Sequence, residues 1–272
     1  MTLEGTFDSA DAPAAEPIVV RTSGTGPPVV LVHGGMPAPM TWAAQQELEA
    51  AWSLIVPNRR GFMPSPAAPS QDFLADADDL VELITDVPGG VHLVGFSYGG
   101  LGAYLAAERL PHLVRSLTLI EAPLWNAAPE DEAVRTLADL ADRFAASPDD
   151  VAAEDEFLAL AGVNQEMLAG VSDDVRQAIE LGRKLRSPWE VKPRFEAITD
   201  AGIPTLVCSG EHNPALEQLC DALATHLGAQ RVRLPGAEHA VQHAPGFNTI
   251  LATFLTAAEQ SRGNGAGGTN ER

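Results

Sequence analysis

The feature that most constrains the fold is a regular alternation of short apolar segments with longer amphipathic ones. Seven short segments rich in valine, leucine and isoleucine are mostly apolar at consecutive positions; they cover residues 18–24, 28–35, 53–58, 91–97, 116–122, 205–210 and 231–236. Consecutive apolar residues are typical of strands buried on both faces of a parallel sheet. Apolar residues recur at helical spacing in the segments between them, at 41–52, 73–84, 98–110, 215–227 and 247–260. This alternation predicts an α/β fold with a doubly wound, mostly parallel sheet.

The alternation is interrupted once, between residues 125 and 200. This stretch has no convincing strand pattern and is an acidic helical sequence rich in alanine and leucine. We therefore expect a helical lid, or cap, inserted after the sixth strand of the fold. The expected organisation is a core formed by residues 1–124 and 201–260, a lid at 125–200, and a disordered glycine-rich tail at 261–272.

Composition and charge indicate a globular chain with few classes of partner. The 272 residues are 45% apolar and 20% charged, and the formal net charge is −20. So acidic a surface repels phosphate backbones and anionic lipids, so neither nucleic acid nor a membrane is an expected partner. The N-terminal residues lack the pattern of a signal peptide, and no apolar run approaches the roughly 20 residues of a membrane helix. We expect a cytoplasmic protein in which Cys208 and Cys220 are free thiols.

One predicted strand is joined to the following helix by Gly95-Phe96-Ser97-Tyr98-Gly99, a G-x-S-x-G sequence. A sharp turn from strand to helix puts the serine in a strained conformation, and glycines two residues away on either side let neighbouring elements approach. Ser97 then lies at a helix N-terminus, where free N–H groups and the helix dipole favour negative charge. The alternative is a glycine-rich turn before a closely packed helix. In this strand–turn–helix context the motif favours Ser97 as a nucleophile.

Together with three further segments, this motif resembles the α/β-hydrolase fold family over nearly the whole chain outside the insertion. "VVLVHGG" is similar to the family's oxyanion-loop strand and "LPGAEHAVQ" to its catalytic-histidine loop. "VPNRRGFMPSP" resembles its D-x-R-G-x-G-x-S loop, with Asn58 in place of the aspartate and Met63-Pro64 in place of small residues. That loop is normally structural. The resemblance implies a hydrolase of the serine type with a helical lid.

The resemblance also implies the oxyanion hole, which needs two preorganised donors for the tetrahedral intermediate of acyl transfer. One is the backbone N–H of Tyr98, which follows the nucleophile. The other comes from the loop after "LVHG", at Gly35, with Met36 as an alternative. His33 is expected to form hydrogen bonds within this loop rather than to take part in chemistry.

For the general base, the resemblance implies His239, which would take the proton from Ser97 and later deliver one to the leaving group. The alternative is an ordinary histidine in a surface loop. His243 lies four residues further on, a spacing that binds metal when it occurs on a helix. No carboxylate pattern accompanies this pair, and glycine and proline surround it. We therefore predict no metal and no cofactor.

The acid of the expected triad is the position at which this chain departs from the family pattern. Family members commonly carry an aspartate in a "G-x-x-D-P" turn, and this chain has Asn213 there, in "GEHNP". An asparagine cannot stabilise an imidazolium by charge, and in the serine protease template aspartate-to-asparagine reduces kcat by about 10⁴. In a subset of the family, including some haloalkane dehalogenases, the acid comes from the end of an earlier strand, where this chain has Glu121. We predict Glu121 as the acid and Asn213 as a possible orienter; the alternatives are Glu211, Glu217, and a Glu121 that only holds the first turn of the lid.

The expected function is that of a cofactor-independent serine hydrolase that cleaves a small carboxylic ester, lactone or thioester through an acyl-enzyme. Met36 and Trp125 are candidates for substrate binding, although large apolar residues in a lid more often form its core. A serine at position 97 argues against epoxide hydrolase and dehalogenase chemistry, which need a carboxylate nucleophile in this fold. Two alternatives remain: a ligand-binding pseudohydrolase with little turnover, and cofactor-free haloperoxidase or lyase chemistry on the same Ser/His frame. The sequence makes no prediction of oligomeric state.

Overall fold

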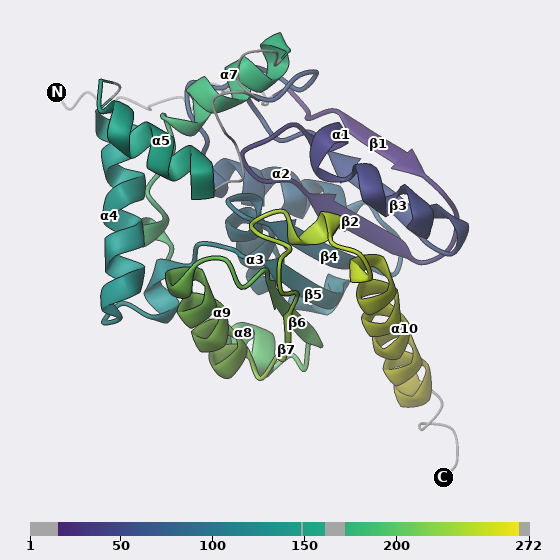
Figure 1. Ribbon diagram of the computed structural model, residues 1–272. Helices are drawn as coiled ribbons and strands as arrows, with labels where there is room; N and C mark the ends of the chain where they lie inside the picture. The colour runs from purple at the N-terminus through teal and green to yellow at the C-terminus, as the bar shows by residue number, and fades with distance from the viewer. Residues whose placement is uncertain (1–15, 148, 161–171, 267–272) are drawn as a thin grey trace, which may run out of the picture.

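At the centre of the molecule lies a seven-stranded sheet (Figure 1). The computed structural model describes residues 16–147, 149–160 and 172–266. The strands are β1 (Val20–Ser23), β2 (Pro28–Val32), β3 (Ser53–Pro57), β4 (Val91–Phe96), β5 (Val114–Ile120), β6 (Thr205–Ser209) and β7 (Gln230–Arg233). Their spatial order is β1-β3-β2-β4-β5-β6-β7, and only the β1–β3 pair is antiparallel. The α/β fold with a mostly parallel sheet is confirmed.

The central strands are apolar at consecutive positions because both faces of the sheet are buried. Val30 and Val32 of β2 belong to one hydrophobic cluster, whereas Val29 and Leu31 belong to another. Alternate side chains of a strand point to opposite faces, so an unbroken apolar run fills two cores at once. The pattern that predicted the strands is therefore explained by burial on both sides.

Helices cover both faces of the sheet, as the doubly wound prediction requires. The first cluster takes residues from α2 (Phe73–Thr85), α3 (Gly99–Arg109), α8 (Phe195–Thr199) and α9 (Pro214–Leu227). The second takes residues from α1 (Ala38–Thr41), η1 (Ala43–Ala50) and α10 (Phe247–Ala266). Two short 3₁₀ helices, η2 (Pro111–Leu113) and η5 (Val241–His243), lie in connections. This arrangement leaves the carboxyl ends of β2, β4, β5, β6 and β7 at one common edge.

Two predicted segments differ from the structure. The helix expected at 41–52 is a short α1 followed by the 3₁₀ helix η1, whose buried residues Gln45 and Leu48 are three apart. A 3₁₀ helix has three residues per turn, so this spacing puts both on the buried face. The disordered tail expected from residue 261 is wrong as far as Ala266, because α10 continues to that residue. Residues 267–272 lie outside the described chain.

The lid segment (residues 125–200) contains helices and, among its described residues, no strand. Its elements before α8 are η3 (Trp125–Ala127), α4 (Glu132–Ala146), α5 (Val151–Leu160), α7 (Asp173–Gly182) and η4 (Pro188–Glu190). Figure 1 shows α4, α5 and α7 grouped to one side of the sheet. The segment follows β5, the fifth strand rather than the sixth, since only four strands precede β5 in the described chain. The division of the chain into core parts and a lid stays a prediction.

The lid segment is attached to the core beside α2. Gln71 and Leu185 form an isolated parallel bridge, and the Arg186 guanidinium pairs with the Asp72 carboxylate at 2.8 Å. Both cysteines are buried free thiols, as predicted. No helix in the described ranges has the length and apolarity needed to cross a bilayer.

Candidate active site

Ser97 lies at the sharp turn between β4 and α3. Its φ of 51° is in the left-handed region, which a non-glycine residue adopts only where the surroundings hold it. A Cβ added at Gly99 would come within 2.0 Å of the His33 carbonyl oxygen, and one at Gly95 within 2.6 Å of Gly100 Cα. Side chains at these two positions would push α3 away from the strands. The glycines of the motif are therefore needed for the packing that holds the serine in place.

Glu121 follows directly after β5, one strand away from Ser97. It also has a positive φ, 43°, and its backbone N–H donates to the Cys208 carbonyl oxygen of β6. The side chain is buried at 0% exposure. One carboxylate oxygen, Oε1, accepts a hydrogen bond from the Gly210 N–H at 2.8 Å. Glu121 is thus fixed between the ends of β5 and β6 with its charge turned into the site.

His239, on the loop after β7, completes a continuous chain of contacts. Its Nδ1 lies 2.6 Å from Glu121 Oε2, and its Nε2 lies 3.1 Å from Ser97 Oγ. An ionised carboxylate only accepts hydrogen bonds, so Nδ1 carries the proton and Nε2 is left to accept from the Ser97 hydroxyl. The structure therefore brings together the three residues that the sequence predicted as nucleophile, base and acid.

The histidine loop comes close to the Glu121 carboxylate because of Gly210. A Cβ added at Gly210 would come within 1.8 Å of the Glu238 carbonyl oxygen, next to His239. The same residue donates its N–H to Glu121. One glycine after β6 therefore permits the approach of the base and binds the carboxylate that faces it.

The electrostatic surroundings keep Glu121 ionised. Burial raises the pKa of its carboxyl, but the His212 and His239 rings and the Gly210 N–H outweigh burial and hold the pKa below its ordinary value. His212 lies at the other carboxylate oxygen, with Nδ1 3.4 Å from Oε1. In return, the Glu121 carboxylate raises the pKa of His212. No sequence pattern marks His212 as a site residue, although it precedes Asn213 in the same turn.

The loop after β2 lies against the serine. A Cβ added at Gly34 would come within 2.8 Å of Ser97 Cβ. Within the described part of the chain, the backbone N–H groups of Gly35 and Tyr98 donate to no protein acceptor. Two unengaged donors on the two segments that flank a serine are what an oxyanion hole requires.

Buried polar groups hold the Gly34–Gly35 peptide from its carbonyl side. The Gly34 oxygen lies 3.1 Å from His33 Nδ1 and accepts from Arg59 Nη1 at 2.9 Å. His33 Nε2 accepts the Arg59 N–H, so Nδ1 carries the ring proton, and burial together with Arg59 lowers the His33 pKa to about 3. Because a trans peptide points its N–H opposite to its C=O, these contacts also orient the Gly35 N–H. His33 has the structural role that the sequence predicted.

Comparison with known sequences gives the family of the chain. A sequence profile described as the alpha/beta hydrolase family matches residues 29–247. The chain belongs to the alpha/beta hydrolase family. The matched range includes the serine turn, the Glu121 strand and the histidine loop.

Two curated relatives and one solved structure illustrate what this alpha/beta hydrolase is similar to. It is 34% identical over 116 residues to a pimeloyl-[acyl-carrier protein] methyl ester esterase from Aeromonas salmonicida (strain A449), which is 42% of this chain and 45% of the relative. It is 33% identical over 105 residues to the protein of that name from Chromobacterium violaceum, 38% of this chain and 40% of the relative. The chain thus spans less than half the length of these relatives. A thermophilic esterase from Thermogutta terrifontis superposes with a TM-score of 0.61 at 25% identity, covering 90% of this chain and 93% of that one.

In this alpha/beta hydrolase, Asn213 has a local structural role. Its Oδ1 accepts the N–H groups of Ala215 and Leu216 at 2.9 and 3.1 Å and so caps the N-terminus of α9. His239 Nδ1 is already bonded to Glu121. The structure does not bring Asn213 to the base, so the possible role as orienter is not supported.

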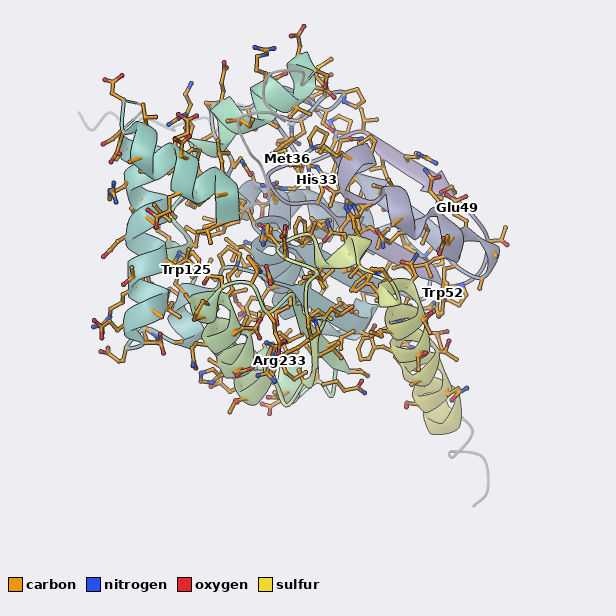
Figure 2. The ribbon with its side chains drawn as sticks, viewed as in Figure 1. His33, Met36, Glu49, Trp52, Trp125 and Arg233 are labelled. Atoms are coloured by element: carbon orange, nitrogen blue, oxygen red, sulfur yellow. The ribbon has the colours of Figure 1, made fainter. Side chains whose placement is uncertain are left out.

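The other predicted residues are distributed around the site. Tyr98 is buried, and its hydroxyl, with a single proton, lies 2.9 Å from the Arg186 carbonyl oxygen and 3.1 Å from that of Gln71, which leaves only its N–H for the oxyanion. Met36 is half-buried beside His33 on the loop after β2 (Figure 2). Trp125 is 5% exposed and packs in the first hydrophobic cluster. Contact of Met36 or Trp125 with substrate stays a prediction.

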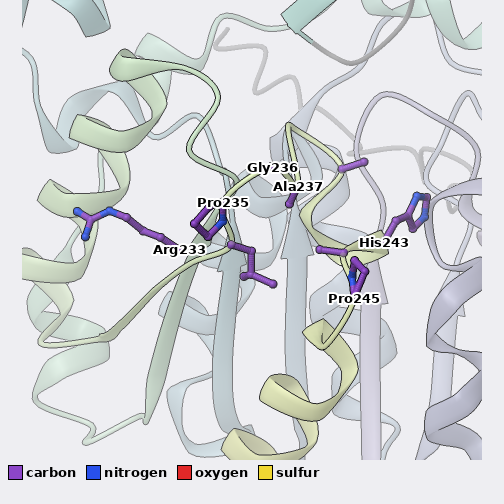
Figure 3. A pocket seen from close by; sticks show the side chains of 9 residues that line it. Arg233, Pro235, Gly236, Ala237, His243 and Pro245 are labelled. Atoms are coloured by element: carbon purple, nitrogen blue, oxygen red, sulfur yellow. The ribbon is translucent and has the colours of Figure 1, made fainter.

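Histidine 243 and the hollow beside it are separate from the site. His243 Nε2 lies 2.9 Å from the Thr41 carbonyl oxygen, so it does not pair with His239. A surface hollow of about 540 Å³ lies along residues 233–245, with Arg233 on one side and His243 on the other (Figure 3). Ser97 and Glu121 are not among the residues that line it. We therefore do not treat this hollow as the substrate pocket.

Proposed function

We propose that the protein is a serine hydrolase that cleaves a small carboxylic ester, lactone or thioester through an acyl-enzyme. The observation that carries the proposal is the unbroken series of contacts from Ser97 Oγ to His239 Nε2 at 3.1 Å and from His239 Nδ1 to Glu121 Oε2 at 2.6 Å. A nucleophile, a base and an orienting carboxylate in hydrogen-bond reach form the arrangement that activates a hydroxyl.

In the acylation step, Ser97 Oγ attacks the substrate carbonyl carbon and His239 Nε2 takes its proton. The carbonyl oxygen becomes an oxyanion, which the N–H groups of Gly35 and Tyr98 bind. When the tetrahedral intermediate collapses, the bond to the leaving group breaks and His239 returns the proton to the leaving oxygen or sulfur. Water then repeats these steps on the acylated Ser97 and releases the acid.

The position of Glu121 supports its role as the acid of this triad. Its carboxylate is buried, keeps its charge, and contacts Nδ1 of the base directly. A negative charge there stabilises the imidazolium that forms on proton transfer and holds the correct tautomer. The replacement of the usual aspartate by Asn213 therefore does not by itself favour a pseudohydrolase.

The similarity to ester-cleaving relatives supports an ester as the substrate. The two curated relatives are methyl ester esterases by name, and the solved structure that superposes along the chain is an esterase. The half-buried Met36 borders the proposed oxyanion loop and is a candidate contact for the acyl group. Small aryl esters with acetyl to octanoyl chains are therefore suitable first substrates.

The proposal is tested with a p-nitrophenyl ester series and a fluorophosphonate probe. We expect the wild type to release p-nitrophenol and to be labelled at Ser97, whereas Ser97→Ala does neither, because the nucleophile is gone. Mass spectrometry of the labelled peptide identifies the residue. A folded wild type that is not labelled and cleaves no ester, lactone or thioester would contradict the proposal and favour the ligand-binding pseudohydrolase.

The acid is tested separately with Glu121→Gln. We expect kcat to fall by about 10⁴, as for the aspartate of the serine protease template, because the imidazolium loses its negative partner. The matched control is Glu211→Gln, the same chemical change at an exposed position in the turn after β6. Near-wild-type kcat in Glu121→Gln, or a comparable loss in Glu211→Gln, would reject the assignment of Glu121.

A further inference from the structure

The Glu121 carboxylate has a histidine at each of its two oxygens. His239 Nδ1 is 2.6 Å from Oε2, and His212 Nδ1 is 3.4 Å from Oε1. The two imidazole ring centroids are 6.0 Å apart. One ligand atom from each of the three residues can be chosen so that all three lie within 4.8 Å of one another. The triad requires His239 and Glu121, but nothing in the proposed reaction uses His212.

The ring nitrogens of His212 also lack well-formed hydrogen bonds to the described part of the chain. Both ring nitrogens are buried, and within the described ranges neither makes a hydrogen bond of good geometry, although the Glu121 carboxylate and the Leu160 backbone face the ring. The contact of Nδ1 with Glu121 has an ionic distance without the geometry of a hydrogen bond. Burying a polar atom without a well-formed hydrogen bond leaves its lost hydration uncompensated, so each such atom calls for an explanation. A ligand between His212 and Glu121 would supply the missing partner.

The donor set is suited to a transition metal. Two imidazoles and one carboxylate form the His₂Glu ligand set of several zinc enzymes, whereas Mg²⁺ and Ca²⁺ prefer oxygen ligands. With zinc–ligand bonds of 2.0–2.1 Å, two ligand atoms of a tetrahedral site are about 3.3 Å apart. The His212–Glu121 separation of 3.4 Å already fits. His239 Nδ1 lies 2.6 Å from the other carboxylate oxygen, Oε2, which is shorter than this ligand–ligand distance. The His239 ring must therefore move away from the carboxylate for zinc to bind.

We propose that Glu121, His212 and His239 form a binding site for Zn²⁺ and that zinc bound there switches off the hydrolase. The binding depends only on these three side chains; the inhibition rests on the proposed function. The sequence predicted no metal, because the His239–His243 pair has no accompanying carboxylate. His212 is the partner that the sequence pattern did not reveal.

Zinc at this site inhibits through the tautomer of His239. In the free site Nδ1 carries the proton and Nε2 accepts from Ser97. A metal on Nδ1 takes the lone pair of that nitrogen, so the single proton of the neutral ring moves to Nε2. Nε2 then faces Ser97 as a donor and has no lone pair for the serine proton. The neutral ring neither gains nor loses a proton overall, and catalysis stops because the base is occupied.

Binding is measured by titrating ZnCl₂ into chelator-treated protein by isothermal calorimetry, after removal of any histidine tag. We expect one equivalent to bind the wild type and MgCl₂ to give no such signal. His212→Gln should bind zinc at least about 100-fold more weakly, because loss of a ligand costs more than the 10–100-fold typical of outer-shell partners. His112→Gln, the same change at an exposed histidine, is the control. If His212→Gln does not fold by circular dichroism, His212→Asn takes its place.

Inhibition is measured on the same proteins, each relative to its own rate in chelator. We expect zinc to inhibit the wild type and His112→Gln at the same concentration, and His212→Gln only at concentrations at least about 100-fold higher. Addition of chelator should restore the rate. Equal inhibition of all three proteins would mean that zinc acts at the Nε2 side of His239, and would overturn the proposal.

The two proposals fail in different ways. Zinc that binds one-to-one and depends on His212, in a protein that cleaves no ester, would leave the site standing and reject the hydrolase. Esterase activity in a protein that binds no stoichiometric zinc would support the hydrolase and reject the zinc site. Zinc affinity unchanged in His212→Gln would overturn the site even if the enzyme is active.

Discussion

Asn213 lies where members of this family commonly carry the catalytic acid, and in this chain it has a structural role. Asparagine and aspartate are both good N-cap residues, because each offers an oxygen to the free N–H groups at the start of a helix. Asn213 does this for α9, with bonds of 2.9 and 3.1 Å. The carboxylate that contacts the base comes instead from Glu121. In the proposed mechanism, the two duties of the usual aspartate are divided between Asn213 and Glu121.

Replacement of Asn213 by alanine should therefore affect stability and not chemistry. We expect Asn213→Ala to lower the free energy of unfolding by about 1 kcal/mol, through loss of the cap, and to leave kcat within a few-fold of wild type. Urea unfolding and p-nitrophenyl ester kinetics measure the two quantities. Asn213→Asp is the control, since it keeps the cap. A fall of kcat in Asn213→Ala comparable to that of Glu121→Gln would contradict this division.

Among the elements, the contact that matters most for the site is that of α3 with the loop after β2. The first residue of α3, Gly99, is so close to the His33 carbonyl oxygen that a Cβ would come within 2.0 Å of it. This close approach holds together the two segments that carry Ser97 and Gly35. The helix therefore does more than cover the sheet, since it fixes the distance between the nucleophile and a proposed oxyanion donor.

Two glycine-to-alanine changes in helices should have opposite effects on the stability of the protein. In an exposed helix the change stabilises by roughly 0.5–1 kcal/mol. Gly182, the last residue of α7, follows this rule, because its nearest neighbour would be 3.7 Å from the new Cβ. Gly99→Ala should instead destabilise by several kcal/mol, of the order seen for overpacked cores, and reduce kcat. Thermal unfolding of both variants checks this; a stabilised Gly99→Ala would show that α3 can move without loss.

At the scale of the whole molecule, two buried histidines link stability to pH. His33 and His92 are each 0% exposed. Burial and the positive charge of Arg59 lower the pKa of His33 to about 3. Burial lowers the pKa of His92 to about 4, although the nearby Glu259 carboxylate acts to raise it. The unfolded chain protonates its histidines near pH 6.5. Between these values the unfolded state binds protons that the folded state does not.

The free energy of unfolding should therefore fall as the pH falls from about 6.5 towards 4. Protonation of His92 in the unfolded chain alone lowers the free energy of unfolding by roughly 2 kcal/mol between pH 7 and pH 4.5. In His92→Gln, the free energy of unfolding should therefore fall by about 2 kcal/mol less over this pH range than in the wild type. Urea unfolding at the two pH values measures it. The control is His112→Gln at an exposed position, and equal pH dependence in the two variants would contradict the linkage.

Local patterns in the sequence were sufficient to predict the sheet and the serine turn, and the resemblance to the family added the histidine loop. The five inner strands of the sheet are recognisable because both of their faces are buried, so each is mostly apolar at consecutive positions. The edge strands β1 and β7 are only partly buried and contain polar residues. The G-x-S-x-G segment carries in five residues the small side chains that a sharp strand-to-helix turn needs. Such features depend on neighbours in the chain and on burial, which a single sequence expresses directly. The 3₁₀ form of η1 was missed because tertiary contacts, such as the hydrogen bond from Gln45 to Gln242, decide how a helical pattern is realised. The end of α10 was missed because residues 261–263 are exposed and have no apolar pattern that marks a helix.

Which carboxylate meets the base, and which histidine stands at its other oxygen, was decided only by the tertiary structure. Glu121 and His239 are 118 residues apart and meet because β5 lies between β4 and β6 at the edge where the loops converge. From the sequence, the resemblance to the family favours Glu121 over Glu211 and Glu217 as the acid, and His212 carries no signal beyond its position beside Asn213. The side chains of a site assembled from several loops are selected by the spatial order of the strands, and that order is a property of the folded sheet rather than of any segment within it.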